Sequence, residues 1–396
     1  MKTAIKLFAR KILILCNNFW CNLFPVDDMR KEIVREKFDV DLILPERHYK
    51  GKNEFYHYNP DYKAAWIDVF EKGITIPDVW YIHFPKVYLI GKGLMISKNK
   101  RIFLESAFFQ REYINKLRVG HLIFKNLFFR PSIRLSHIIP LMNRLSNNYS
   151  HWTIDNLTRI ALFLKQDPTA RHQYHLAINH NAPAYVTDSL VHLIGWPSER
   201  IIRFKNNDVA EVSDCIFISY PVQRDASTLM TYAYPNEIYQ VLNQYAVTNI
   251  HLTGNQLPTN FIISRAKSIE RNLVNEQVLV DKFRDINMEI VQLEDLNFVE
   301  QVQLFQNARL IIAAHGAGLT NTLYCNKNAF VFELFPIGRS IHQTSSFSQI
   351  SRAIGFHLHL IMIEPINEKE DMIVNDELVK KIKKISGQYK QETLSA

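Results

Sequence analysis

Apolar segments of two kinds alternate along the second half of the chain. Short apolar runs are typical of buried strands, and longer segments with apolar positions three and four residues apart are typical of amphipathic helices. Strands and helices that alternate in this way form a parallel sheet with helices on both faces. The predicted strands are 261–264, 288–293, 310–314, 330–335 and 356–363, and the predicted helices are 273–283, 298–305, 319–324 and 376–385.

The first half of the chain has a more mixed pattern. Residues 87–104 contain β-rich runs broken by Gly91, Gly93 and Asn99, which predicts an antiparallel hairpin or meander. An apolar stripe of helical period covers 151–166. Beyond it, the pattern predicts strands at 174–178, 200–204 and 215–220 and a helix at 186–194. The pattern weakens before Pro235, so we expect an α/β protein with a domain boundary near residue 234.

Composition adds a bias toward anionic partners. The 396 residues are 47% hydrophobic and 22% charged, as in ordinary globular proteins, and the formal net charge is +8. This charge favours nucleotide phosphates, acidic glycans, anionic lipid or nucleic acid, or it only keeps the protein soluble. The four scattered cysteines form no C-x-x-C pair, which suits a reducing, cytoplasmic location.

The N-terminal segment is cationic and amphipathic. Its apolar run at 12–16 is too short for a signal peptide or a membrane span. Residues 2–24 therefore predict either a surface segment that rests on the inner face of the membrane or a helix packed on its own domain.

The strongest candidate for chemistry is the stretch 309–335. A predicted strand ends at His315, a Gly316-Ala317-Gly318 turn follows, and a helix is expected from Leu319. Ligands of open α/β sheets bind beyond the carboxyl ends of strands, glycines permit close approach and positive φ, and a helix N-terminus suits a diphosphate. Thr320 adds a hydroxyl, and Asn321 is able to bond a ligand or the turn itself. The alternative is a tight junction with a structural histidine.

Further polar candidates accompany this turn. Arg265 and Arg271 follow a predicted strand, and guanidinium groups suit bidentate phosphate contacts, although either could form a surface salt bridge. Asn275 and Glu276 are suited to reading a ribose or a base edge, or to capping the next helix. Glu333 could accept hydrogen bonds from ribose or sugar hydroxyls, or serve the structure alone.

Three motifs together resemble glycosyltransferase family 61. The first is HGAGLTN (315–321) followed by ELFP (333–336); the second is Ser264-Arg265, then Arg271, Asn275 and Glu276; the third is NYSHWTID (148–155). The resemblance covers about residues 80 to 365 and implies a GT-B fold, in which two Rossmann-like domains face a central cleft. It also implies a nucleotide-sugar donor, UDP-linked, with the donor site at 264–276, 315–321 and 333, and inversion at the anomeric carbon.

His151 and Asp155 are the candidate catalytic residues. They are four apart, so they share one face of a helix near its N-terminus. An inverting transferase needs a base for the acceptor hydroxyl, and a histidine serves at neutral pH. Asp155 could orient the imidazole or be the base itself, and the block could instead form the acceptor floor.

Metal and nucleic-acid sites are less favoured. Asp39-Val40-Asp41 is a D-x-D that precedes an apolar run, unlike the metal ligands of GT-A enzymes, and His172, His175 and His180 straddle a predicted strand. The basic aromatic run 111–134 accompanies no nucleic-acid-binding module, so a lipid-facing or solvated face is preferred. We expect no metal and no other cofactor.

The resulting hypothesis has three parts along the chain. Residues 1–75 form a segment that is a candidate for membrane association, 76–234 an acceptor-side domain, and 235–396 a nucleotide-sugar-binding domain. The protein would transfer a sugar to a glycan acceptor, lipid-linked, in the synthesis of capsule or another surface polysaccharide. The alternatives are a non-catalytic glycan- or nucleotide-binding protein of the same fold and a metal-dependent GT-A transferase.

Overall fold

The computed structural model describes residues 26–27, 38–49, 74–99, 101–107, 133–222, 234–251, 257–338 and 345–392. The predictions for 2–24 and for almost all of 111–134 lie outside these residues. The chain divides into two compact units, each described below by itself. Unit 1 comprises Met1–Arg47, Thr75–Val191 and Gly195–Leu229, and unit 2 comprises His48–Ile74, His192–Ile194 and Met230–Ala396. The domain limits at 75 and 234 stay predictions.

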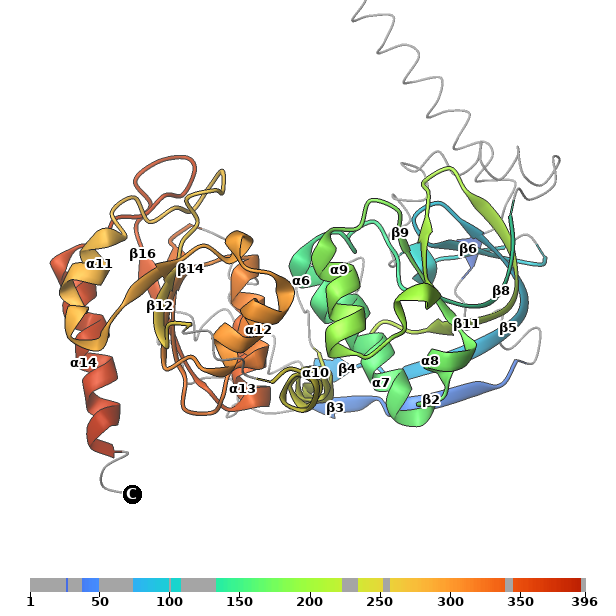
Figure 1. Ribbon diagram of the computed structural model, residues 1–396, viewed down its shortest axis with the longest axis horizontal. Coiled ribbons are helices and arrows are strands. Elements are labelled where there is room, and N and C mark those ends of the chain that lie inside the picture. Colours follow the sequence, from blue (N-terminus) through green and yellow to red (C-terminus); the bar gives the residue numbers. More distant parts are fainter. Residues whose placement is uncertain are drawn as a thin grey trace, which may run out of the picture. The chain divides into compact units, whose positions relative to one another are not determined.

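Unit 1 is built on a mixed sheet of nine strands (Figure 1). Strand β11 lies at its centre, antiparallel to β5 and parallel to β8, and β8, β9 and β10 continue in parallel. The predicted meander is confirmed by β5, β6 and β7, which are successive antiparallel neighbours. The strands are β1 (Val26–Asp27), β2 (Val40–Leu44), β5 (Val79–Ile90), β6 (Leu94–Ser97), β7 (Ile102–Phe103), β8 (Ile133–Pro140), β9 (His175–Asn179), β10 (Ile201–Phe204) and β11 (Val209–Ile218). Strands β3 (Arg47–Tyr49) and β4 (Ile74–Ile76) pair separately.

The predicted helix at 151–166 is confirmed, with one irregular stretch. It begins as α6 (Tyr149–His151), widens into a π-helical segment (Trp152–Leu157) and continues as α7 (Thr158–Gln166). The side chain of Asn148 caps its start by accepting from the His151 N–H. Helices α8 (Ala170–Gln173) and α9 (Ala184–Asp188) follow, and a second π-helical segment covers Ser189–Leu193. Single π-turns inside helices are frequent at functional sites.

Unit 2 is a parallel sheet of five strands in the order β13-β12-β14-β15-β16. The strands are β12 (Asn260–Ile263), β13 (Glu289–Val291), β14 (Leu310–Ala314), β15 (Phe330–Pro336) and β16 (His357–Ile363). Helices α11 (Gln277–Lys282) and α14 (Asp376–Glu392) cover one face, and α10 (Asn236–Asn249), α12 (Phe298–Gln306) and α13 (Ser345–Ile354) lie on the other (Figure 1). The predicted parallel sheet with helices on both faces is confirmed here.

Two predicted helices of unit 2 differ from the structure. Helix α11 begins at Gln277 rather than at residue 273, because the preceding residues pair with a distant loop: Leu273 bridges to Met372. The short helix expected at 319–324 is a 3-10 helix, Ala317–Tyr324, whose tighter turns present backbone N–H groups differently from an α-helix.

The face of the unit 2 sheet that α11 and α14 cover is closed by an apolar core. Ile262, Ile312 and Phe332 point from the strands, and Leu279 and Ile382 meet them from α11 and α14. Near-continuous apolar strands are expected where both faces are covered.

The strand order decides where unit 2 can hold a ligand. The first strand, β12, lies between the second and the third, so the chain leaves β12 toward one side and β14 toward the other. The carboxyl ends of these two neighbours form the topological switch point at which open α/β sheets bind ligands.

The Rossmann-like expectation therefore fits unit 2 and only the parallel part of unit 1, where β5, β6 and β2 make the sheet mixed. The GT-B assignment stays a prediction. Among the helices that the structure describes, none is both long and apolar enough to cross a membrane.

Candidate functional site

The predicted donor residues of unit 2 gather at the switch point. Ser264 and Arg265 follow β12, and His315 and Gly316 follow β14, whose residues pair with β12 in parallel register. The guanidinium of Arg265 lies against Gly316: a Cβ at that glycine would stand 3.0 Å from Arg265 Cζ. The missing side chain therefore makes room for a cation.

One of the two reasons expected for the glycines, a left-handed backbone, does not apply. Neither Gly316 nor Gly318 lies in the left-handed region, and Gly316 is extended, at φ 174°. A Cβ at Gly318 would meet the Leu293 side chain at 2.9 Å. Gly318 thus permits close packing of the turn, whereas Gly316 permits the approach of Arg265.

His315 forms a buried pair with Glu333. The imidazole Nδ1 lies 2.5 Å from Glu333 Oε1, and its ring packs against Phe335 and Phe347. Glu333 is fully buried within β15, and its Oε2 has no hydrogen-bond partner. Burial raises the pKa of Glu333, and the contact with His315 opposes that shift. Of the two roles predicted for Glu333, contact with ribose or sugar hydroxyls and a structural role, the buried contact with His315 fits the structural one.

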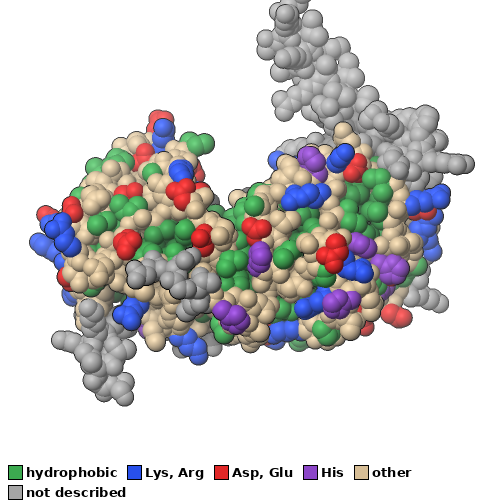
Figure 2. Space-filling model, in the orientation of Figure 1, with side chains coloured by type: hydrophobic (Ala, Val, Ile, Leu, Met, Phe, Trp, Pro, Cys, Tyr) green, Lys and Arg blue, Asp and Glu red, His purple; other side chains and the backbone are tan. Residues whose placement is uncertain are grey.

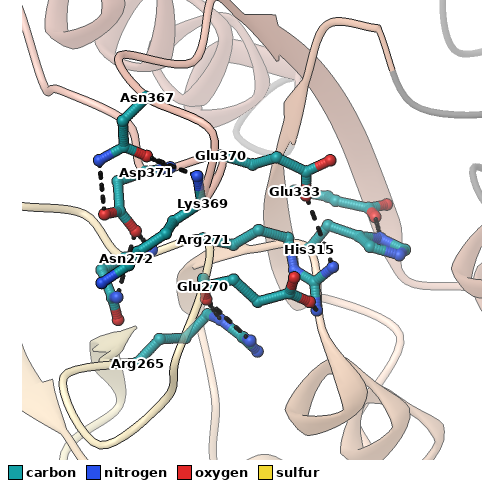
Figure 3. Close-up of polar contacts among 10 residues, drawn as sticks. All are labelled: Arg265, Glu270, Arg271, Asn272, His315, Glu333, Asn367, Lys369, Glu370 and Asp371. Carbon is teal, nitrogen blue, oxygen red and sulfur yellow. Dashed lines mark hydrogen bonds and ion pairs between the residues drawn. The ribbon is translucent and has the colours of Figure 1, made fainter.

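Arg271 lies beside this pair and is held by two carboxylates (Figure 3). Its side chain is 12% exposed and forms ion pairs with Glu270 at 2.7 Å and Glu370 at 3.7 Å. Arg271 and Glu370 both adopt the left-handed backbone region, at φ 62° and 58°. The Arg265 Nε and Nη2 donate to the Glu270 carbonyl at 3.3 and 3.2 Å. Two cations are thus fixed next to the His315 turn.

A clamp between two loops positions these arginines. The Arg271 N–H donates to the Lys369 carbonyl, and the Asn272 N–H donates to Asp371 Oδ1 at 2.8 Å. The Asn275 amide donates to the Val374 carbonyl and accepts from its N–H, both at 2.8 Å. These contacts occupy both ends of the Asn275 side chain, so the residue holds the loop rather than a cap or a base edge.

Ser264 and Glu276 bond each other. The Ser264 Oγ donates to Glu276 Oε1 at 2.8 Å and accepts from the Ala266 N–H. Glu276 precedes α11 without a side-chain capping bond. The pair joins the end of β12, next to Arg265 in sequence, to the start of α11.

The remaining predicted donor residues differ in access. His315, Ala317 and Gly318 are partly exposed, whereas Leu319, Thr320 and Asn321 are enclosed. The Asn321 amide donates to Gln301 Oε1 at 3.0 Å, and Thr320 Oγ1 is buried without a hydrogen-bond partner. Both side chains are buried in the packing beneath the turn, which for Asn321 fits the predicted alternative of a bond within the protein. Their role in donor binding stays a prediction.

The predicted catalytic pair of unit 1 is in contact. His151 Nδ1 lies 2.7 Å from Asp155 Oδ2; the His151 side chain is 33% exposed and that of Asp155 is 1% exposed. The Asn156 amide donates to the His151 carbonyl, and the Asn143 amide donates to Asn156 Oδ1. A half-open imidazole with a buried carboxylate behind it is the arrangement of a positioned base.

Comparison with known proteins decides the family. Residues 149–332 match the family model described as glycosyltransferase 61. This part of the chain belongs to glycosyltransferase 61. The match includes the His151 pair and, in unit 2, the switch point with the HGAGLTN turn, so the predicted resemblance is confirmed.

Named relatives of the glycosyltransferase 61 region cover short stretches. Protein O-linked-mannose beta-1,4-N-acetylglucosaminyltransferase 2 from Xenopus tropicalis is 30% identical over 112 residues, 28% of this chain and 19% of the relative. The human protein of that name is 28% identical over 116 residues, 28% and 20% of the two chains. EGF domain-specific O-linked N-acetylglucosamine transferase from Bos taurus is 26% identical over 155 residues, 35% and 29%. The matches span about a fifth to under a third of the relatives' length, and the relatives are glycosyltransferases by name, the enzyme class predicted for this chain.

The metal-like patterns of the sequence have other surroundings. Asp39 and Asp41 are exposed; Asp39 lies just before β2 and Asp41 is its second residue. His172 and His180 are exposed on either side of β9, and His175 opens it. Within the described ranges, no group of three histidine, cysteine or acidic residues is placed to hold a metal ion.

Two residues of the sites escaped sequence reasoning. Glu270 is adjacent to Arg271 in sequence, so its position could have suggested it. Glu370 is about one hundred residues from its partner Arg271 and carries no local signal.

We expect the Glu333→Gln variant to gain stability over the native protein as pH rises. The pKa of Glu333 is raised in the folded state, so the folded protein holds the Glu333 proton more tightly than the unfolded chain does. The native protein therefore loses stability as pH rises above the ordinary value of 4.5, whereas the glutamine variant does not. The gain should be about 1.4 kcal/mol for each unit of the raised pKa. Denaturant unfolding at about pH 5 and about pH 8 measures it, with the exposed Glu289→Gln of β13 as control. If Glu333→Gln and the native protein differed in stability by the same amount at both pH values, a burial-raised pKa of Glu333 would be contradicted.

Proposed function

We propose that the chain is an inverting glycosyltransferase that moves a sugar from a UDP-linked donor to a glycan acceptor. The observation that carries the proposal is the guanidinium of Arg265 against Gly316 at the switch point of a parallel sheet. Family membership of this region supports the reaction class.

The donor diphosphate would lie on the exposed edge of the HGAGLTN turn. His315, Ala317 and Gly318 are accessible there, and Arg265 supplies donors next to them. Arg271 adds a second cation whose partners, Glu270 and Glu370, are the anions that a diphosphate would replace. Fixed cations stabilise the negative charge that develops on the departing nucleotide, which is electrostatic preorganisation.

The acceptor would be activated by His151. Its Nε2 takes the hydroxyl proton as the acceptor oxygen bonds to the anomeric carbon, and the nucleotide leaves with the electron pair of the broken C–O bond. The Asp155 carboxylate, 2.7 Å from the other ring nitrogen, stabilises the imidazolium. One in-line displacement inverts the anomeric centre. The proposal places the base on unit 1 and the donor on unit 2.

The donor sugar and acceptor are assigned only by class. The relatives' names state transfer of N-acetylglucosamine, which makes an N-acetylhexosamine the first donor to test, with hexoses and pentoses next. A lipid-linked surface glycan at the inner face of the membrane is the proposed acceptor. A thermal-shift series of nucleotide sugars tests the donor, because a ligand that binds the folded state raises the melting temperature; transfer to an acceptor separates the enzyme from a non-catalytic binding protein.

We expect Gly316→Ala to weaken UDP binding without unfolding the protein. The new Cβ would displace the far end of the Arg265 side chain, which is flexible. Loss of charged hydrogen bonds predicts about 10- to 100-fold weaker affinity by calorimetry. Arg265→Ala should weaken UDP binding by a similar factor, and the Gly316→Ala/Arg265→Ala double variant should bind UDP no more weakly than either single variant. Gly387→Ala in α14, where a Cβ meets nothing within 4 Å, is the control. Native UDP affinity in folded Gly316→Ala would rule out this donor site.

We expect His151→Gln to lower turnover by about two to four orders of magnitude, the usual effect of removing a positioned base. UDP affinity should stay close to native, because the donor residues belong to unit 2. Assays of UDP release with acceptor measure turnover, and His172→Gln, an exposed histidine of α8, is the control. Normal turnover with a raised acceptor KM would mean that residues 148–155 bind the acceptor and do not supply the base. His315 would then be the next candidate for the base.

We expect transfer to continue in EDTA. Arg265 and Arg271 supply the positive charge that a metal supplies in GT-A enzymes. Initial rates with and without chelator, at saturating donor, are the measurement. Loss of activity that Mn²⁺ or Mg²⁺ restores would favour the metal-dependent alternative.

A further inference from the structure

Three side chains four residues apart form a column on the helix that carries the proposed base. His151, Asp155 and Arg159 lie in successive turns of α6, the π-helical segment and α7. Exposure falls along the column: the His151 side chain is 33% exposed, and Asp155 and Arg159 are buried. The column therefore leads from the surface into the interior of unit 1.

Arg159 is fixed by contacts that leave one nitrogen uncommitted. Its Nε donates to the Ile218 carbonyl at 2.8 Å, and its Nη2 bonds the same oxygen. The guanidinium lies 4.1 Å from the centre of the Tyr220 ring and 5.2 Å from that of Phe217. Its Nη1 is buried without a hydrogen-bond partner. These contacts, a carbonyl and two aromatic rings, include no anion to balance the buried positive charge of Arg159. Burying an unbalanced charge costs several kcal/mol.

Asp155 precedes Arg159 by one helical turn and is buried with it, so its carboxylate is placed to offset the buried charge. Burial lowers the pKa of Arg159, while Tyr220 and Asp155 oppose that shift. Tyr220, from the segment after β11, lies with its ring against the Arg159 guanidinium, and its hydroxyl accepts from the Asn143 amide. Asn143 also donates to Asn156, which bonds the His151 carbonyl. The same set of residues thus supports both ends of the column.

We propose that Arg159 is a positioning residue whose buried charge, one helical turn from Asp155, disfavours proton uptake by the His151–Asp155 pair. The imidazole is then ready to accept the proton of the acceptor hydroxyl. Arg159 itself touches no reacting atom. This inference rests on the proposed function of His151.

The direction of the effect follows from Coulomb's law. A positive charge near the pair disfavours uptake of a further proton, so removal of that charge must raise the pH at which the pair becomes protonated. A charge within a few ångströms in a buried site shifts such a midpoint by about 1 to 3 pH units.

The test follows the protonation of His151 by NMR in the full chain labelled with ¹³C at histidine Cε1. The His151 signal is the one missing from His151→Gln. Arg159→Gln removes the charge and keeps a donor for the Ile218 carbonyl, and we expect its His151 midpoint to rise by about 1 unit or more. Turnover at neutral pH should fall about tenfold and recover at higher pH. Arg159→Lys keeps the charge and should retain the native midpoint.

Thr158→Val is the matched control. Thr158 is as buried as Arg159 on the same helix, and its hydroxyl bonds the Ile154 carbonyl, so this variant loses a buried polar group without changing the charge. It should lose stability and keep the midpoint. If Arg159→Gln does not fold, Arg159→Met, of similar length and without a polar group, carries the same expectation.

The outcomes separate the inference from the proposed function. An unchanged His151 midpoint in folded Arg159→Gln or Arg159→Met overturns the inference, even if His151→Gln is inactive. A raised midpoint together with native turnover in His151→Gln keeps the electrostatic role of Arg159 and overturns His151 as the base. A midpoint raised equally by Thr158→Val would assign the effect to helix packing and also overturn the inference.

Discussion

The close approach of Arg265 to the backbone at Gly316 is the constraint on which the donor site depends. It requires three conditions together: β12 and β14 as parallel neighbours, a residue without a side chain directly after β14, and a loop after β12 that turns back over the sheet. Gly318 packs closely against Leu293, because it has no side chain. This close packing keeps the turn after β14 near the sheet, where Gly316 meets Arg265. In the proposed donor site, a cation fixed in this position would meet a diphosphate without moving, which would lower the cost of binding.

The loop that carries both arginines is rigid because it is paired, although it has no regular structure of its own. Asn272 and Asn275 bond the segment 371–374, and Asn367 in turn bonds Asp371, whose pKa is lowered by those amide and N–H contacts. Exposed Ile269 and Val274 show that the outer side of the same loop is not stabilised by apolar burial. On its outer side the loop is held by hydrogen bonds, while on its inner side Leu273 joins the hydrophobic core of unit 2.

The chain holds two histidine–carboxylate pairs with different surroundings. His315 is 12% exposed between two phenylalanine rings, and its partner Glu333 is a buried acid with a raised pKa. His151 is more open, and Arg159 is buried four residues beyond Asp155. In the proposed function the first pair orients a turn and the second exchanges a proton with the acceptor.

Sequence alone was sufficient where the determinant is local. Period and strand length predicted the parallel sheet of unit 2, the meander at 87–104 and the helix that carries His151, and the four-residue spacing of His151 and Asp155 is enough to bring them together. The motifs also identified the family of residues 149–332. What Gly316 is for, which residues of HGAGLTN face outward, and the enclosure of Thr320, Asn321 and Glu333 were decided by the tertiary structure. So were the partners Glu370 and Asp371, because contacts between residues about one hundred positions apart depend on which strands become neighbours, and no local pattern encodes that order.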